Sequence, residues 1–177
     1  MKKKQFFLIF SIYFTILSCN SGKLKTQSDV VNIDSNKEKM IIANKYLANQ
    51  DAEIIEAYAK RRNWNLQQTQ TGLWYDIYKK TKGDSIYAND YLLISYKAEL
   101  LDGTVCYVVD SMQPVEIRMG KADVKQGLVE GLMYMCEGEK ARIIVPQYLA
   151  FGLLGDQQKI PPRSTVIYDI FIQKILK

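Results

Sequence analysis

Hydrophobic and polar residues alternate with a period of two along much of the second half of the chain. The alternation is clearest at residues 92–100, where aliphatic and aromatic side chains alternate with Ser, Lys and Glu. It recurs in four further runs, at residues 73–78, 115–119, 143–145 and 165–175. This period places successive side chains on opposite faces of a strand. Asp102-Gly103 directly follows the clearest run and predicts a hairpin, because Gly accepts a positive φ.

Two other segments have a helical period. The first has one apolar face made of Val124, Leu128, Leu132 and Met135. The second runs from about Lys39 to Arg62. Met40-Ile41-Ile42-Ala43 opens one stretch of it, and Asn49 or Asp51 could cap a second stretch, in which acidic residues precede basic ones. Its apolar stripe consists of Ile54, Ile55, Tyr58 and Ala59. This stripe fits a helix packed on its own domain or an arm for dimerisation, and its shortness favours the first reading.

Together these patterns predict an α+β fold, in which a twisted antiparallel sheet wraps one short helix and a helical segment comes before it. An apolar cleft is expected between the sheet and the helix. We expect a signal peptide at residues 1–18, a polar flexible tether at 19–37, the helical segment at 38–66 and the main domain at 67–177.

The N-terminus has the anatomy of a secretory signal. Lys2-Lys3-Lys4 precedes an apolar run from Phe6 to Leu17, which is shorter than the ~20 apolar residues of a membrane-spanning helix. Ile16-Leu17-Ser18-Cys19 resembles a bacterial lipobox, so we expect acyl chains such as palmitate on Cys19. A plain signal peptide with a coincidental Cys is the alternative. The lipobox predicts a lipid-anchored protein of the cell envelope that faces the periplasm.

Composition narrows the possible chemistry. The net charge of +5 falls to +2 when the three signal lysines are removed, and no basic stripe with interleaved aromatic residues supports nucleic-acid binding. Because the chain has no His, Ser-His-Asp and Cys-His catalysis in their ordinary forms are excluded. No spacing typical of metal ligands or phosphate loops is present. Cys106 and Cys136 could pair in an oxidising compartment, but buried free thiols are favoured.

From about Gly72 to Ile175, the chain resembles the FK506-binding-protein (FKBP) type of peptidyl-prolyl cis–trans isomerase. The motifs that carry this resemblance, in chain order, are Ser95-Tyr96, Leu101-Asp102-Gly103-Thr104, Met119-Gly120, Gly127-Leu128-Val129-Glu130-Gly131, Gly138-Glu139-Lys140-Ala141, the run from Pro146 to Gly152, and Ile160-Pro161-Pro162. With its helical extension and lipobox-like start, the chain is similar to the envelope lipoprotein members of this family, some of which are associated with gliding motility.

The resemblance implies an isomerase (EC 5.2.1.8) that rotates Xaa-Pro bonds in an apolar pocket and assists protein folding. It implies no cofactor and no metal, and its substrates would be proline-containing polypeptides. A homodimer through the N-terminal helix is a further expectation. Two alternatives remain: a catalytically weak FKBP-like chaperone or binding module, and a purely structural lipoprotein.

The resemblance also implies the site residues. Catalytic roles fall to Tyr96, Tyr107, Phe151 and Tyr168. Substrate-binding roles fall to Cys106, Val115, Ile117, Val124, Lys125, Leu128 and Ile160. Lys125 would act through its backbone N–H on a ligand carbonyl, and residues 153–159 would overhang the pocket.

At four places the chain departs from the family pattern. Cys106-Tyr107 replaces a Phe-Asp pair, Leu128 replaces a Trp, Phe151 replaces a Tyr and Val115 replaces a common Phe. These changes remove polar groups and aromatic surface but retain apolar walls. They imply a slow isomerase with altered ligand preference and weak affinity for FK506-like macrolides. The Tyr107 hydroxyl is a candidate replacement for the lost carboxylate.

Overall fold

The computed structural model describes residues 27–121 and 124–176. Its elements are α2 (Gln27–Arg62), β1 (Gln67–Gln68), β2 (Trp74–Lys79), β3 (Tyr91–Leu100), β4 (Val105–Val109), β5 (Val115–Arg118), α3 (Gln126–Leu132), β6 (Lys140–Val145) and β7 (Val166–Leu176). The chain forms two compact units, residues 1–42 and 43–177, which divide within α2. No helix in the described part combines the length and the apolar character needed to cross a membrane.

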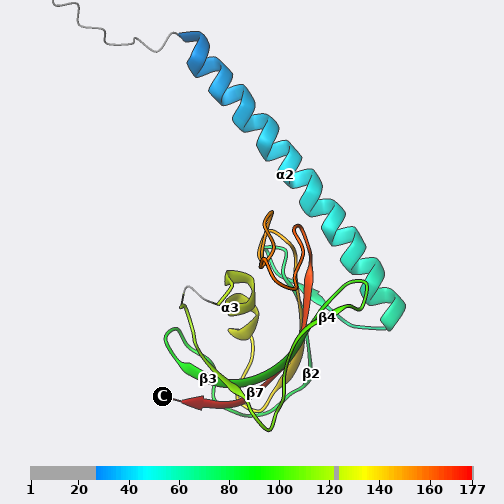
Figure 1. The fold of residues 1–177 in the computed structure, drawn as a ribbon, viewed down its shortest axis with the longest axis vertical. Helices are drawn as coiled ribbons and strands as arrows, with labels where there is room; N and C mark the ends of the chain where they lie inside the picture. Colours follow the sequence, from blue (N-terminus) through cyan, green and yellow to red (C-terminus); the bar gives the residue numbers. More distant parts are fainter. Residues whose placement is uncertain (1–26, 122–123, 177) are drawn as a thin grey trace, which may run out of the picture. The chain divides into compact units, whose positions relative to one another are not determined.

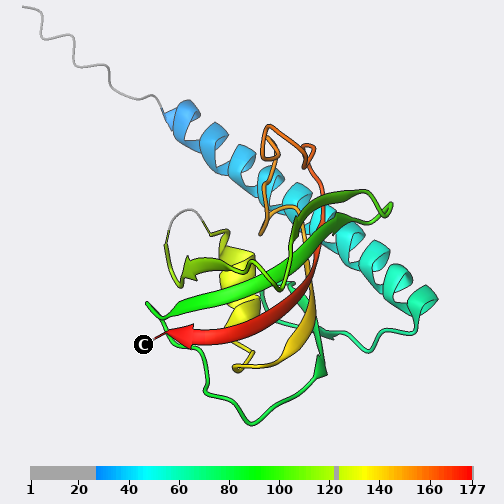
Figure 2. The ribbon, with the colours of Figure 1, turned by 60° about the horizontal axis from the view of Figure 1, so that its bottom comes forward.

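The seven strands form one antiparallel sheet in the order β1-β2-β6-β7-β3-β4, and β5 also pairs with β3. The long strands β3 and β7 pair along their whole lengths at its centre. The sheet is strongly curved, and α3 lies in its hollow (Figures 1 and 2). This arrangement confirms the predicted α+β fold with a sheet wrapped on one short helix.

Two glycines let α3 approach the sheet closely. A Cβ on Gly127 would lie 2.5 Å from Val145 Cγ1, and one on Gly131 would lie 2.8 Å from two carbon atoms of Ile143. Only residues without a side chain fit at such separations. The helix is shorter than the predicted stripe, since Val124 precedes it and Met135 follows it.

The last turns of α2 pack on the outer face of the sheet. Ile55 and Tyr58 are buried in a second apolar cluster with Ile144 of β6 and Ile167 of β7. This contact favours the reading of a helix packed on its own domain. Ile54, part of the predicted stripe, is 53% exposed, which makes the buried face narrower than expected.

The helix α2 corrects the expected boundary between tether and helix. It begins at Gln27, inside the polar segment expected to be flexible, and continues without a break past Asn49 and Asp51. No Pro or Gly occurs between Lys23 and Arg62, so nothing in the chain interrupts helical hydrogen bonding. The polar residues of this segment show no helical period, so the sequence predicted a flexible tether where the structure has a helix.

The end of α2 lies at Arg62, where the helical pattern of the sequence also ends, four residues before the expected segment boundary at residue 66. Asn63 has a positive φ of 55°. Its N–H donates to the Lys60 carbonyl, and the Trp64 N–H donates to the Ala59 carbonyl. This pair of hydrogen bonds is the Schellman arrangement, which satisfies the last carbonyls of a helix.

Candidate functional site

A pocket of about 310 Å³ opens between the inner face of the sheet, α3 and the loop that follows β6. Its lining consists of Ile94, Tyr96, Tyr107, Val115, Ile117, Val124, Lys125, Leu128, Phe151, Asp156, Gln158, Ile160 and Tyr168. The structure thus brings together ten of the eleven predicted pocket residues. It also adds Ile94, which sequence reasoning missed, and Asp156 and Gln158, which belong to the segment 153–159 that was expected to overhang the pocket.

Cys106 is the predicted pocket residue that does not line the pocket. It is the extra residue of a β-bulge, because Ala98 pairs with Tyr107 while the next residue of β3, Glu99, pairs with Val105. A bulge changes where the following side chains point. The Cys106 side chain is 3% exposed and lies in the core behind the pocket wall. The expectation of direct substrate contact is corrected accordingly.

Both cysteines of the described domain are free thiols. Cys106 is buried and Cys136 is half-buried. The Cys106 thiol donates to the Lys159 carbonyl at 3.5 Å. Burial raises its pKa, so it remains a neutral thiol.

Two tyrosines form the deep aromatic part of the pocket. The rings of Tyr96 on β3 and Tyr168 on β7 meet edge to face, with centroids 5.9 Å apart. Both rings line the pocket. Burial raises the pKa of both phenols, so both keep their protons at neutral pH. The pocket therefore contains two hydroxyl donors.

The mouth of the pocket is bordered by Lys125 and Phe151. Lys125 directly precedes α3 in an extended conformation, with ψ of 139°. Its ammonium lies 5.0 Å from the centre of the Phe151 ring, within the range of a cation–π contact. The backbone N–H of Lys125 makes no hydrogen bond to a residue within 27–121 or 124–176. A ligand carbonyl is the partner that the resemblance implies for it.

A polar contact crosses the opposite side of the pocket. The Tyr107 hydroxyl on β4 donates to Asp156 Oδ2, in the loop after β6. This hydrogen bond is the first cause that raises the pKa of Tyr107 to about 12. The resemblance implied that residues 153–159 overhang the pocket, but the sequence did not predict this contact, which joins residues 49 positions apart.

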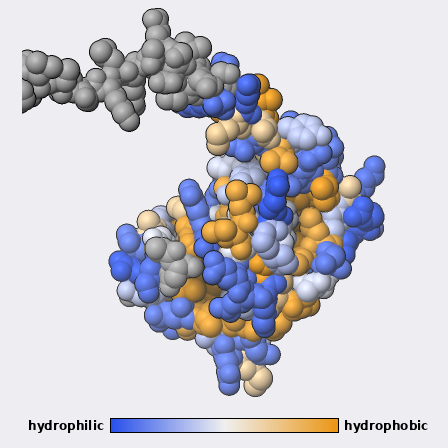
Figure 3. Space-filling view, turned by 45° about the horizontal axis from the view of Figure 1, so that its top comes forward, coloured by the Kyte–Doolittle hydropathy of each residue, from blue (hydrophilic) through white to orange (hydrophobic). Residues whose placement is uncertain are grey.

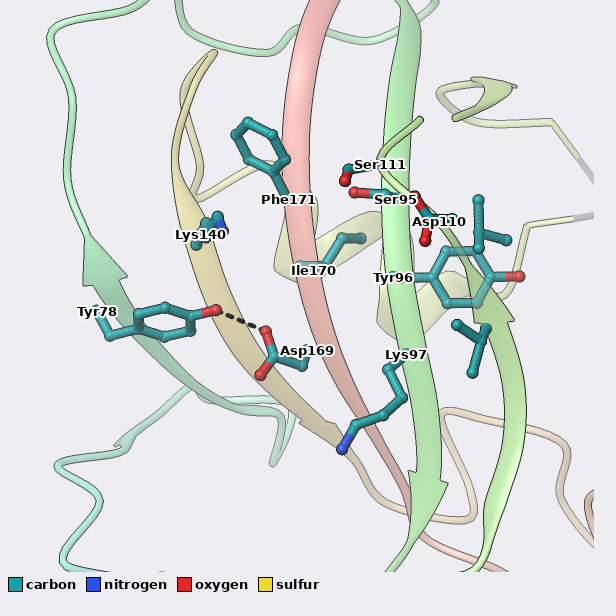
Figure 4. Close-up of a pocket in the computed structure, with 12 residues that line it drawn as sticks. Tyr78, Ser95, Tyr96, Lys97, Asp110, Ser111, Lys140, Asp169, Ile170 and Phe171 are labelled. Atoms are coloured by element: carbon teal, nitrogen blue, oxygen red, sulfur yellow. Dashed lines mark hydrogen bonds between the residues drawn. The ribbon is translucent and has the colours of Figure 1, made fainter. Parts of the chain in front are cut away.

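The outer face of the sheet carries a second hollow of about 300 Å³ (Figure 4). Charged and polar side chains line much of it, and the Tyr78 hydroxyl donates to Asp169 Oδ1 at 2.6 Å. It lacks the predominantly apolar wall that is typical of small-ligand sites. Within the described ranges, no group of three or more His, Cys, Asp or Glu side chains could hold a metal ion.

The loop beside the pocket exposes apolar side chains. Leu153 and Leu154 are each 72% exposed. The space-filling view that brings the top of Figure 1 forward shows apolar residues at the surface among polar ones (Figure 3). A polypeptide at the pocket mouth would find apolar surface next to it.

Comparison with known families identifies the family of the chain. The family model for FKBP-type peptidyl-prolyl cis-trans isomerases matches residues 83–173. The chain belongs to this family. The FKBP match contains β3 to β6, α3 and most of β7, which carry the pocket. It confirms the resemblance drawn from the sequence motifs.

Two curated relatives show how far the similarity extends. The chain is 30% identical over 159 residues to a probable FKBP-type peptidyl-prolyl cis-trans isomerase of Haemophilus influenzae, covering 84% of this chain and 65% of that protein. It is 30% identical over 131 residues to the FKBP-type 22 kDa peptidyl-prolyl cis-trans isomerase of Escherichia coli, covering 73% and 62%. This FKBP thus spans slightly less than two thirds of each.

A solved structure supports the architecture. The crystal structure of FkpA from Escherichia coli matches with a TM-score of 0.62 and 23% identity, covering 99% of this chain and 82% of that one. At this identity the similarity establishes the fold alone.

Proposed function

We propose that this FKBP is a prolyl isomerase of the bacterial cell envelope, which rotates Xaa-Pro bonds in the 310 Å³ pocket and assists the folding of proline-containing polypeptides. The observation that carries the proposal is the convergence of aliphatic walls and two tyrosine hydroxyls in one pocket of a chain from this family. No cofactor takes part in the proposed reaction.

The chemistry requires no nucleophile. A planar amide is stabilised by resonance that separates charge, and rotation must overcome a barrier of about 18–20 kcal/mol. The twisted amide has less charge separation, so apolar surroundings favour it over the planar one. Differential binding of the twisted form lowers the barrier. Each ~1.4 kcal/mol of such preference raises the rate tenfold.

The polar groups of the pocket would hold the substrate carbonyls. The Lys125 N–H binds one carbonyl at the pocket mouth, as the resemblance implies. The hydroxyls of Tyr96 and Tyr168 are donors inside the pocket. They offer a replacement for the donor that is missing at Phe151. The surrounding aliphatic residues, including Ile117 and Ile160, exclude water from the rotating bond.

The test is cis–trans exchange on peptides with different hydrophobic residues before proline, using a soluble form that begins at Asn20. We expect acceleration that saturates with peptide concentration and disappears in a Tyr168→Ala variant. A folded domain without any acceleration would contradict the proposed enzyme activity.

A second candidate function is a catalytically weak chaperone or binding module. The Phe151 side chain has no hydroxyl, and the Tyr107 proton is directed at Asp156 instead of toward a substrate. Leu153 and Leu154 offer exposed apolar contacts to an unfolded chain. Suppression of client aggregation by a form that does not accelerate exchange would favour this function.

Lipid attachment at Cys19 is part of the proposal. Residues 1–18 and Cys19 lie outside the described residues, so support comes from the lipobox-like sequence. Acyl chains on Cys19 would hold the domain at a membrane, facing the periplasm. Mass spectrometry of the protein from a bacterial envelope should find cleavage before Cys19 and acylation at it. A Cys19→Ser variant should be released into the soluble fraction.

We also propose a homodimer through the N-terminal helix. Met40, Ile41, Ile42 and Tyr46 of α2 are each more than half exposed. Apolar side chains clustered within seven positions are unusual on a helix that remains in water. Sedimentation of the form that begins at Asn20 should show dimers, and a Met40→Glu/Ile41→Glu variant should show monomers.

A further inference from the structure

Two departures from the family pattern contact the same loop. The Cys106 thiol donates to the carbonyl of Lys159, and the Tyr107 hydroxyl donates to Asp156. The Lys159 ammonium also lies 5.1 Å from the centre of the Tyr107 ring. The bulge in β4 makes this possible, because it allows consecutive side chains to reach one loop. Cys106 and Tyr107, the two residues that depart from the family pattern, thus connect β4 to residues 156–160.

Asp156 organises this loop with one oxygen and attaches it to β4 with the other. Oδ1 accepts the N–H groups of Gln158, Lys159 and Ile160 at 2.7–2.9 Å. The Asp156 N–H donates to the Ile160 carbonyl at 3.0 Å, which closes the turn. Oδ2 accepts the Tyr107 hydroxyl. The same carboxylate therefore closes the turn and holds the turn against β4.

The turn closes tightly on itself. Gly155 has a φ of 67°, and a Cβ at this position would lie 2.3 Å from the Ile160 carbonyl oxygen. Ile160 is buried in the core. This turn contributes Asp156, Gln158 and Ile160 to the pocket, and it can act as a wall only if it is held in place.

We propose that Tyr107 and Asp156 act as a pair of positioning residues, which holds residues 156–160 as a pocket wall and thereby sets substrate affinity. The inference rests on the proposed function of the same pocket. The pair does not act on the rotating amide, because the single Tyr107 proton is already donated to Asp156. Without the pair, the loosened wall would have to be ordered during binding. Loss of the pair therefore raises KM and leaves kcat largely unchanged.

The electrostatics agree with a neutral tyrosine that donates to an ionised carboxylate. Burial alone would raise the pKa of Asp156. The hydrogen bonds from Tyr107 and from the three N–H groups outweigh it and hold the pKa below the usual range. The titratable side chains that interact with the carboxylate are Tyr107 and Cys106 from β4 and Tyr168 from β7, and the Lys159 ammonium lies over the Tyr107 ring. The pair therefore stays intact at neutral pH.

The test compares two tyrosine–aspartate pairs in the same chain. Tyr107→Phe removes the pocket hydroxyl, whereas Tyr78→Phe removes the hydroxyl bound to Asp169 in the outer hollow (Figure 4). In the full-length chain, purified in detergent, we expect Tyr107→Phe to raise KM for a proline peptide about tenfold and to change kcat less than twofold. Tyr78→Phe should leave both constants at the wild-type values.

A second variant and a double mutant show whether the two residues act together. Asp156→Asn keeps an oxygen for the turn and loses the charge that the Tyr107 hydroxyl binds. It should raise KM as well. The double variant Tyr107→Phe/Asp156→Asn should have a KM no higher than that of the single variant with the higher KM. Additive effects, or an equal effect of Tyr78→Phe, would overturn the pairing. A fall in kcat at unchanged KM would overturn the positioning role.

Hydrogen exchange of backbone amides tests the Tyr107–Asp156 pair independently of the proposed isomerase activity. Tyr107→Phe should speed hydrogen exchange at Gln158, Lys159 and Ile160, and Tyr78→Phe should not. If the wild-type chain does not isomerise peptides, the proposed function fails and exchange at these amides still decides whether the pair positions the loop. Unchanged exchange in Tyr107→Phe would overturn the pair even if the chain is an active isomerase.

Discussion

At the scale of single residues, the pocket differs from the family pattern mainly in its polar groups and keeps its apolar walls. Tyr107 donates to Asp156, which supplies a carboxylate from the loop in place of one on β4. Tyr96 and Tyr168 keep hydroxyls that can serve a substrate. The sequence predicted the positions of these tyrosines but not the direction of the Tyr107 hydroxyl, because that direction depends on the bulge at Cys106.

The Tyr168 hydroxyl should contribute to turnover. In Tyr168→Phe we expect kcat/KM to fall about twofold to tenfold, the effect of losing one net hydrogen bond of about 0.5–1.5 kcal/mol in the transition state. The measurement is peptide cis–trans exchange. Tyr75→Phe is a matched control, because its hydroxyl donates to Gln67 and lies outside the pocket lining. An unchanged rate in Tyr168→Phe would show that this hydroxyl does not bind the substrate.

The pH dependence of the reaction should be flat near neutrality. The chain has no His. The pKa values of Tyr96, Tyr107, Tyr168 and Cys106 are raised, and that of Asp156 is lowered, so all five move away from neutral pH. We expect kcat/KM to vary less than about twofold between roughly pH 5 and pH 8. A bell-shaped profile within this window would contradict the assigned protonation states.

FK506 should bind weakly. Leu128 is smaller than the Trp that it replaces, and Phe151 lacks the usual hydroxyl, so apolar contact and one hydrogen bond are lost together. We expect a dissociation constant above about 1 µM. Calorimetric titration measures it directly, and nanomolar affinity would contradict the reading of these two residues.

At the scale of elements, alternation predicted five of the seven strands, and it did so most clearly for β3, where buried and less buried residues also alternate along much of the strand. No alternating run predicted β1 or β4. The sheet and the hairpin at Asp102-Gly103 appear where the pattern placed them, with Gly103 at a φ of 91°. The start of α2 was missed because a polar helix has no burial pattern to reveal it. The early end of α3 was missed because Met135 is buried just beyond the helix.

The packed part of α2 should stabilise the domain. Ile55 is completely buried against the sheet, whereas its neighbour Ile54 is 53% exposed. Ile55→Ala should lower the free energy of unfolding by about 2–5 kcal/mol, since it leaves a cavity. Ile54→Ala should change it by less than about 0.5 kcal/mol. Urea unfolding measures both, and equal effects would show that the helix does not pack as described.

At the scale of the whole molecule, the pocket is assembled from segments far apart in the chain. β3, the segment before α3, the loop after β6 and β7 each supply part of the wall. The resemblance to the family predicted ten of the residues that line the pocket, because the family motifs mark their positions along the chain. The segment 153–159 was expected over the pocket, but the contacts of Asp156 could not be predicted, since they depend on how the turn closes and where β4 meets it.

The central claim is that this pocket turns over Xaa-Pro bonds despite its altered polar groups. The most direct measurement is peptide cis–trans exchange with the form that begins at Asn20, alongside its Tyr168→Ala variant. We predict clear acceleration by the first and none by the second, with both proteins folded by circular dichroism. Equal rates in the two, or no acceleration by the unaltered domain, would contradict the claim and favour a binding module that keeps the fold without the reaction.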